Sequence, residues 1–207
     1  MSRTLHDYPS VSLKPEDFDG KIDFKRIFGR SGPFHIEIGT GKGGFLLNEA
    51  KNQPDANFLG IEWASRYYRY AVDRIGRWDL KNVRIIRTDA VFFLTDFVAD
   101  DCVDCFHIYF PDPWPKKRHH KRRFFCPANM VQLIGALKTG GQLKIATDHA
   151  EYFGQIRKLI ADESDRLTEI EFVPTAGAEV GEWVGTNFER KYVKQNMPIY
   201  TLALKKV

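Results

Sequence analysis

Strand and helix signals alternate along most of this chain, and that alternation limits the folds open to it. Short runs rich in β-branched and aromatic residues predict strands, and apolar residues at helical spacing follow each run. Neighbouring parallel strands need crossover connections, which such helices supply. The sequence therefore predicts an α/β fold with a mostly parallel sheet and helices on both faces. The expected strands are residues 34–38, 58–61, 83–86, 105–110 and 143–146, with further candidates at 170–173 and 199–204.

The first 33 residues depart from this pattern. Pro9, Pro15 and a turn cluster at 29–33 interrupt a mainly polar segment, which predicts an irregular arm. The expected organisation is an N-terminal arm, 1–33, followed by one α/β domain, 34–207.

The lack of a recognisable targeting signal and the low cysteine count limit the cellular compartments in which the protein is expected. The first twenty residues lack the apolar run of a signal peptide, and no run approaches the roughly eighteen apolar residues of a membrane span. Three cysteines in 207 residues argue against a disulfide framework. Cys102 and Cys105 point to opposite faces if their segment is extended, so free thiols are expected there and no metal site. The cytoplasm is the expected compartment.

The fourth predicted strand runs into a loop of distinctive composition. Pro111-Asp112-Pro113-Trp114-Pro115 places three prolines in five positions, which stops helix and strand alike and holds Asp112 and Trp114 on a stiff loop. Residues 116–123 then include six lysines and arginines and no acid. The formal charge of the whole chain is +4, so without these six cations the remainder carries −2. Basicity this local predicts one surface that faces a polyanion.

A glycine-rich turn follows the first predicted strand. Gly39-x-Gly41-x-x-Gly44 matches the dinucleotide-binding fingerprint, and Glu62, at the end of the next strand, could bind ribose hydroxyls. A tight turn would also explain the glycines. Glu37, however, lies two residues before the first glycine, where a carboxylate would repel a pyrophosphate and attract a cation. S-adenosylmethionine, which carries a sulfonium and an ammonium but no phosphate, is therefore the expected cofactor.

Four acids lie at the ends of four consecutive predicted strands, and ligands of parallel sheets bind outside the carboxyl ends of the strands. On this hypothesis Glu62 holds the ribose diol of the cofactor, Asp89 reaches the adenine edge and Asp112 faces the methionine end. Simpler interpretations stay open, because Asp89 could only cap the helix from Ala90 and Glu62 could be a solvated strand end.

Together these motifs resemble the tRNA (guanine-N7)-methyltransferase family in its single-chain bacterial form, from roughly Phe34 to the C-terminus. The resemblance implies a class I methyltransferase (Rossmann-like) fold of seven strands with the last antiparallel, and methylation of a guanosine in the tRNA variable loop. The arm is short for the family. The matching segments are Glu37-Ile38-Gly39-Thr40-Gly41-Lys42-Gly43, Gly60-Ile61-Glu62, Thr88-Asp89-Ala90, residues 110–119 with Lys121-Arg122-Arg123, Ala146-Thr147-Asp148 and Thr186-Asn187-Phe188-Glu189.

Guanine N7 bears a lone pair and no proton, so alignment and electrostatic support are expected from the enzyme, with no general base. Asp112 is the expected catalytic residue, which either bonds the N–H edge of the base or stabilises the positive product. Lys116 is expected to hold a phosphate or the base, while Trp114 could stack on a base or pack beneath the loop. The remaining expected substrate-binding residues are Arg118, His119, His120, Lys121, Arg122 and Arg123 in the basic run, and Asp148, Thr186, Asn187, Phe188 and Glu189 at the family's substrate-side positions.

Alternatives remain at this stage. Thr186-x-x-Glu189 is also a capping box, in which case Phe188 could belong to the core. The rival functions are methyl transfer to another RNA base or to an exocyclic amino group, a nicotinamide oxidoreductase, and a non-catalytic RNA-binding module. The expected partner is tRNA, with no membrane and no obligate protein partner, and the expected state is a monomer or a homodimer.

Overall fold

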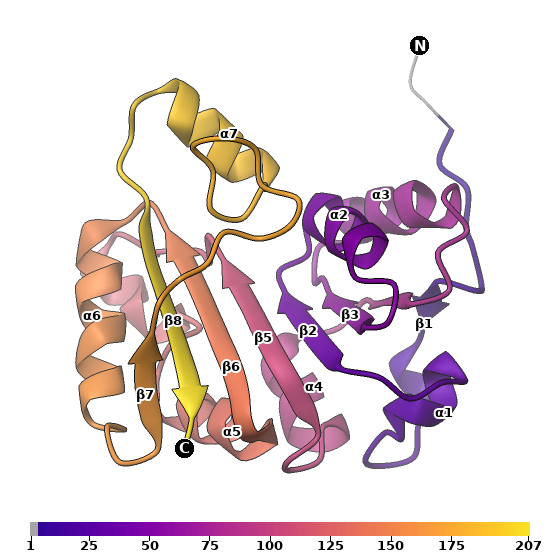
Figure 1. The fold of residues 1–207 in the computed structure, drawn as a ribbon, viewed down its shortest axis with the longest axis horizontal. Helices are drawn as coiled ribbons and strands as arrows, with labels where there is room; N and C mark the ends of the chain where they lie inside the picture. The colour runs from indigo at the N-terminus through magenta and orange to yellow at the C-terminus, as the bar shows by residue number, and fades with distance from the viewer. Residues whose placement is uncertain (1–3) are drawn as a thin grey trace. The chain divides into compact units, whose positions relative to one another are not determined.

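A computed structural model describes residues 4–207 of the chain, which divides into two compact units, residues 1–99 and 100–207. Both units are α/β, with helices packed on parallel or mixed strands (Figure 1). No helix in the described part of the chain has the length and apolar character needed to span a membrane.

The first unit contains four parallel strands in the order β1-β4-β3-β2. Their bounds are β1 (Ser12–Leu13), β2 (Phe34–Ile38), β3 (Asn57–Ile61) and β4 (Val83–Ile86). All five residues of β3 are buried, as expected for a central parallel strand covered on both faces. The predicted strands at 34–38, 58–61 and 83–86 are confirmed.

The helices of this unit are α1 (Phe24–Phe28), α2 (Gly44–Asn52), α3 (Ser65–Gly76) and α4 (Ala90–Phe97). Helices α2, α3 and α4 each follow a strand, as the sequence predicts, whereas α1 lies in the arm and was not predicted. Helix α2 packs against β3, β4 and α3. The close approach of α2 and α3 needs a glycine at position 43, because a Cβ there would lie 3.0 Å from the Cβ of Ala71. The packing thus brings the glycine-rich turn and the start of α3 into one region of the unit.

The arm is more regular than the sequence predicts. It contains β1, a short 3₁₀ helix, η1 (Pro15–Asp17), and α1. Strand β1 pairs with β4, and the backbone amide of Ile22 donates to the carbonyl of Phe97. With β1 the described residues hold eight strands, one more than the resemblance implies. The boundary at residue 33 stays a prediction.

The second unit contains a mixed group of strands in the order β5-β6-β8-β7 (Figure 1). Strands β5 (Val103–Tyr109) and β6 (Leu137–Thr147) are parallel. Strand β8 (Tyr200–Lys206) lies between β6 and β7 (Leu167–Ile170) and runs antiparallel to both. The expectation of a last strand that is antiparallel is therefore confirmed.

The strand candidate at 170–173 is wrong, because it overlaps β7 only at Ile170 and Phe172 lies beyond the strand, against the ring of Trp183 at 5.9 Å. The strand expected at 143–146 is confirmed but is longer than predicted, because β6 begins at Leu137 and passes through Gly140 and Gly141. Gly140 has φ +80°, and the β5–β6 register shifts between Val103 and Cys105, so the pair forms an irregularity inside the strand.

Three α-helices and one 3₁₀ helix complete the unit: η2 (Lys117–Arg122), α5 (Pro127–Ala136), α6 (Ala150–Ala161) and α7 (Asn187–Lys194). Pro127 occupies the first turn of α5, where a missing backbone amide is tolerated. Tyr152 of α6 is fully buried beside Phe125, and Phe153 stacks on Tyr200 of β8. Figure 1 shows α7 above the arrowheads of β5 and β6, at the carboxyl ends of these strands.

Candidate functional site

Glu37 is the most unusual acid of the first unit. It lies in β2 with only 4% of its surface exposed, and its Oε2 has no hydrogen-bond partner among the described residues. The pKa of its carboxyl is raised from 4.5 to about 8, mainly by burial and also by the negative charges of Glu62 and Glu49. The Thr40 hydroxyl opposes the rise in pKa, yet Thr40 Oγ1 is itself buried without a partner in hydrogen-bond geometry. Two adjacent acceptors are thus buried in an unsatisfied state.

The glycine-rich turn wraps beside these acceptors. The amides of Gly39 and Thr40 both donate to the carbonyl of Ile61, at 2.9 and 3.1 Å. Gly39 and Gly41 have φ of +82° and +56°, a region that side chains other than glycine rarely adopt. A Cβ at Gly39 would meet no atom within 4 Å, so the glycine serves the backbone conformation and leaves space above it. Gly60 is needed for a different reason, because its Cβ would lie 2.4 Å from Thr40 Oγ1.

Glu62 fixes the shape of this turn. Its Oε2 accepts from the amide of Gly41 and its Oε1 from the amide of Ala64, each at 2.7 Å. The side chain therefore ties the turn to the end of β3, and with 8% exposure it is not the solvated strand end of the simpler interpretation. We call Glu37, Thr40 and Glu62, with the glycine turn, the acidic cradle.

Asp89 is exposed and caps α4 by accepting from the amide of Phe92 at 3.0 Å. The predicted capping role is confirmed. A contact between Asp89 and adenine stays a prediction.

Asp112 of the second unit lies on a loop with two left-handed residues, which we call the proline loop (residues 110–115). Phe110 has φ +51° and Trp114 has φ +43°, conformations that cost energy for bulky residues and cluster at functional sites. The amide of Phe110 still pairs with the carbonyl of Ala146, at 2.7 Å. The chain thus turns sharply after β5, and Asp112 is exposed.

The basic run after the proline loop folds as η2. Trp114 packs edge-on against His119 with ring centroids 5.8 Å apart, and the guanidinium of Arg122 lies 5.0 Å from its ring centroid. Trp114 is half-buried, so it supports the run as well as the loop. Five of the six permanent cations of the run are exposed: Lys116, Lys117, Arg118, Lys121 and Arg122.

The sixth, Arg123, is a correction to the sequence analysis. It is only 3% exposed and does not face solvent as an RNA contact would require. Its Nε donates to the carbonyl of Pro113 at 2.7 Å, and its two terminal nitrogens bind the carboxylate of Glu151, while Nη1 also donates to Gln155 Oε1 at 2.5 Å. The hydrogen bond from Arg123 holds the pKa of Glu151 below its ordinary value. Arg123 therefore joins the proline loop to α6.

Glu189 is a second correction. It is fully buried, and its carboxylate accepts from the amides of Trp183, Val184 and Gly185. Thr186 Oγ1 accepts from the Glu189 amide at 3.1 Å, so the threonine caps α7 as the capping box predicts. The glutamate instead closes the loop ahead of the helix, and it does not face a substrate.

Phe188 and Asp148 differ from this pair because solvent reaches both. Phe188 is 52% exposed, so it is not a core residue, and its ring lies 6.4 Å from that of Phe110. Asp148 follows β6 directly and is half-buried. Burial and the hydrogen-bonded, negatively charged Asp148 raise the pKa of Tyr192. Asn187 is exposed at the start of α7.

Tyr192 and Thr40 were missed in the sequence analysis. The ring of Tyr192 lies 5.7 Å from that of Phe110. Its position four residues after Phe188 places both rings on one helical face, which was the available signal. For Thr40 the signal was a hydroxyl between two glycines that must adopt positive φ.

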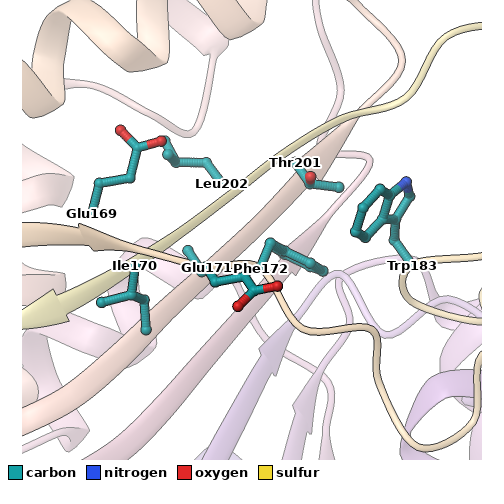
Figure 2. Close-up of a pocket in the computed structure, with 8 residues that line it drawn as sticks. Glu169, Ile170, Glu171, Phe172, Trp183, Thr201 and Leu202 are labelled. Atoms are coloured by element: carbon teal, nitrogen blue, oxygen red, sulfur yellow. The ribbon is translucent and has the colours of Figure 1, made fainter.

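One pocket of the second unit is lined by none of the residues that the sequence analysis assigned to a catalytic or binding site. It has a volume of about 320 Å³ and opens beside the carboxyl end of β7 (Figure 2). Figure 2 shows Glu169 and Trp183 at opposite ends of its lining. Glu169 is already paired with Arg157, at 3.1 Å. The lining residues are Glu169, Ile170, Glu171, Phe172, Trp183, Thr201, Leu202 and Ala203.

Comparison with known proteins identifies the family. A family model described as a putative methyltransferase matches residues 31–202. A tRNA (guanine-N(7)-)-methyltransferase of Rhodopirellula baltica is 34% identical, over 97% of this chain and 76% of the relative. One of Listeria welshimeri is 31% identical, over 97% of this chain and 92% of the relative. The chain belongs to the tRNA (guanine-N7)-methyltransferase family.

Solved structures agree with the family at the level of the fold. A 30S ribosomal A1408 methyltransferase from an uncultured bacterium matches with a TM-score of 0.58 and 16% identity, over 90% of this chain and 95% of that one. A SAM-dependent methyltransferase of Aquifex aeolicus matches with a TM-score of 0.53 and 14% identity, over 88% and 86% of the two chains. The chain thus has the Rossmann-like methyltransferase fold with a mixed, mostly parallel set of strands.

The acidic cradle of this methyltransferase-family chain fits S-adenosylmethionine. An ammonium group supplies N–H donors for the two buried, unpartnered acceptors Glu37 Oε2 and Thr40 Oγ1, and it supplies a positive charge that favours the ionised form of Glu37. The open space over Gly39 lets a ligand approach the backbone. A pyrophosphate would instead meet the carboxyls of Glu37 and Glu62, which argues against a nicotinamide dinucleotide.

Proposed function

We propose that this protein transfers a methyl group from S-adenosylmethionine to N7 of a guanosine in tRNA, at the variable-loop position implied by the family. The observation that carries the proposal is the buried, unpartnered carboxyl of Glu37 in the glycine cradle, in a chain that also presents an exposed acid and a basic run after β5. The relatives support tRNA as the substrate, because they are named tRNA (guanine-N(7)-)-methyltransferases.

The residues of the first unit hold the cofactor. S-adenosylmethionine supplies an electrophilic methyl carbon whose bond to sulfur breaks as the new bond forms. Glu37 and Thr40 bind its ammonium group, Glu62 binds the ribose diol in the orientation set by the Gly41 and Ala64 amides, and Asp89 contacts the adenine edge. The proposed cofactor-binding residues of this unit are Glu37, Gly39, Gly41, Glu62 and Asp89.

Asp112 supports the chemistry on the guanine. With S-adenosylmethionine bound, guanine N7 would take up the methyl group through its lone pair, and because N7 carries no proton, the protein would not have to accept one. The ring becomes cationic, and a nearby carboxylate stabilises that charge or holds the N–H edge of the base. The exposure of Asp112, on a loop that Arg123 joins to α6, suits this role.

The exposed cations of η2 and Lys116, the residue before it, bind the RNA backbone. Lys116, Lys117, Arg118, Lys121 and Arg122 contact phosphates, and with five such contacts the slope of log affinity against log salt would approach about −3.5. His119 and His120 contribute to the same surface. Asp148, Asn187 and Phe188 contact the substrate from the carboxyl-end side of β6, where the exposed Phe188 ring offers a stacking surface for a base.

Nucleoside analysis tests the proposal. Purified protein is incubated with unmodified tRNA and methyl-labelled S-adenosylmethionine, and the digest is analysed for labelled nucleosides. Labelled 7-methylguanosine from the wild type, lost in Asp112→Asn, is the expected result. Label on another nucleoside would refute guanine N7 as the target while keeping the methyltransferase chemistry. No label at all would refute the activity. We further propose the cytoplasm as the compartment of the protein. We also propose that it is a monomer or a homodimer, and size-exclusion chromatography tests this oligomeric state.

A further inference from the structure

Aromatic and arginine side chains gather on one surface, formed by the residue pair before α3 and by the first two turns of the helix. We call it the α3 surface: Trp63, Arg66, Tyr67 and Arg69, which are exposed, and Tyr70, which is half-buried. Trp63 is 69% exposed and Tyr67 is 42% exposed. Arg66 and Arg69 are exposed too, and neither has an ion-pair partner among the described residues. These positions recur at helical spacing, opposite the buried face of Ala71, Val72 and Ile75.

Neighbouring elements add positive charge to this surface. Lys42, from the glycine-rich turn, has its ammonium 5.5 Å from the ring centroid of Tyr70. Arg87, after β4, donates to the carbonyl of Trp63 at 3.4 Å. Residues 63–72 contain no acid, and Glu62, just before them, is buried with its carboxylate on two backbone amides. The surface is therefore cationic and is not neutralised by its own residues.

The N-terminal arm packs on the second half of α3, and in the first half its residue Ser12 contacts Tyr68. The amide of His6 donates to Asp73, and the ring of Tyr8 lies where a Cβ on Gly76 would be placed. Within the described first unit, Trp63, Arg66, Tyr67 and Arg69 nevertheless stay exposed. Large aromatic side chains left in water beside unpaired arginines are the combination that single-stranded and loop RNA recognises, since bases stack on the rings and phosphates pair with the guanidinium groups.

We propose that the α3 surface is a second tRNA-binding site, separate from the basic run after β5, which takes an unpaired segment of the substrate by base stacking on Tyr67 and Trp63 and by phosphate contacts to Arg66 and Arg69. The inference rests on the proposed function, because it takes the polyanion to be the tRNA that is methylated. The positive charge would attract either RNA or an acidic protein segment. The exposed rings favour RNA, because bases stack on them and peptide carboxylates do not.

The charge test compares two double variants of the full-length protein. Arg66→Gln with Arg69→Gln removes two cations from the α3 surface, whereas Lys25→Gln with Arg26→Gln removes two exposed cations from α1 in the same unit. Unmodified tRNA is titrated at several salt concentrations. The α3 variant should lower the steepness of the salt dependence by about 1.4 and weaken binding, while the α1 variant should match the wild type. Equal behaviour of the two variants would overturn the proposal.

The stacking test compares Tyr67→Ala with Tyr67→Phe, which keeps the ring. Loss of a base stack should weaken tRNA binding about fivefold or more in the alanine variant only. S-adenosylhomocysteine affinity, measured by calorimetry, should be unchanged in all these variants, which separates an RNA contact from damage to the cofactor cradle. Equal tRNA affinity in the two Tyr67 variants would refute stacking. If the wild type methylates tRNA and every α3 variant binds tRNA normally, only the proposal of the α3 surface is refuted. If the wild type does not methylate tRNA, the proposed function is refuted.

Discussion

Glu37→Gln should make the protein more stable at neutral pH and at the same time remove its cofactor affinity. The substitution keeps the size of the side chain but replaces the ionisable carboxyl with an amide that does not titrate. In the unfolded chain this carboxyl ionises near 4.5, whereas in the folded chain it stays protonated up to about 8. The unfolded state thus binds fewer protons between these two values, and the free energy of unfolding falls as the pH rises through that window.

The magnitude follows from the size of the shift. One pKa unit corresponds to about 1.4 kcal/mol, so the wild type should lose on the order of 3 kcal/mol between pH 4.5 and pH 7 from this group, an upper figure for one carboxyl. The glutamine side chain of the variant does not titrate, so the variant should lack that loss. The difference in free energy of unfolding between variant and wild type should therefore grow steadily from pH 5 to pH 8.

Urea unfolding of the cofactor-free proteins at pH 5, 6, 7 and 8 measures this difference. Glu62→Gln is the matched control, because it makes the same change in the same cradle. The Glu62 oxygens, unlike Glu37 Oε2, accept hydrogen bonds from backbone amides, those of Gly41 and Ala64. Glu62→Gln should lower the free energy of unfolding by about 1–3 kcal/mol at every pH. Parallel pH profiles for Glu37→Gln and the wild type would refute the argument from burial.

Cofactor binding provides the second half of the test. If only the ionised form of Glu37 binds the ammonium group, the ionised fraction and hence the affinity of the wild type should rise about ninefold from pH 6 to pH 7. Glu37→Gln should bind S-adenosylmethionine far more weakly and without that pH dependence. A wild-type affinity that is flat over this range would contradict the proposed pairing.

Four further outcomes follow from the second unit. Asp112→Asn should lower the turnover number by a factor of about 100 or more with little change in S-adenosylmethionine affinity, and near-normal turnover would exclude Asp112 from the mechanism. Arg123→Lys cannot reproduce the planar fork that binds Pro113, Glu151 and Gln155, so turnover should fall while the salt dependence of tRNA binding stays that of the wild type. Arg122→Gln, its neighbour and control, should instead lower that salt dependence by about 0.7, and a reversed pattern would return Arg123 to the RNA surface. Glu189→Gln should lower the free energy of unfolding by about 1–3 kcal/mol, because it disturbs the carboxylate that accepts three backbone amides, and unchanged urea unfolding would contradict its structural role.

Local signals predicted most of the elements. The β-branched and aromatic content of 83–86 and the cap at Asp89 act within a few residues of their own position, and the structure reproduces both. The strand candidate at 170–173 was misleading because tertiary contacts, not local preference, decide its conformation. Phe172 packs on Trp183 outside β7, a contact between residues that the pattern does not connect.

The site shows the same division. Sequence identified the acids at the strand ends, since their types and positions relate to chemistry directly. It did not separate Arg123 from the five other cations of the run, because its partners Glu151 and Gln155 lie about one helix and one strand further along the chain. Glu189 was misjudged for a related reason, since a carboxylate that closes its own loop looks in sequence like one that awaits a ligand.

The placement of β8 sets an order for folding during synthesis. Strand β7 pairs only with β8 among the described strands, and β8 follows every other strand of the second unit in the sequence. While the ribosome is still making residues 171–199, β7 has no neighbour and β6 has an open edge, whereas the strands of the first unit are already complete. Nascent chains stalled before β8 should thus hold a folded first unit beside an unpaired, aggregation-prone edge of β6, which β8 covers when it inserts between β6 and β7.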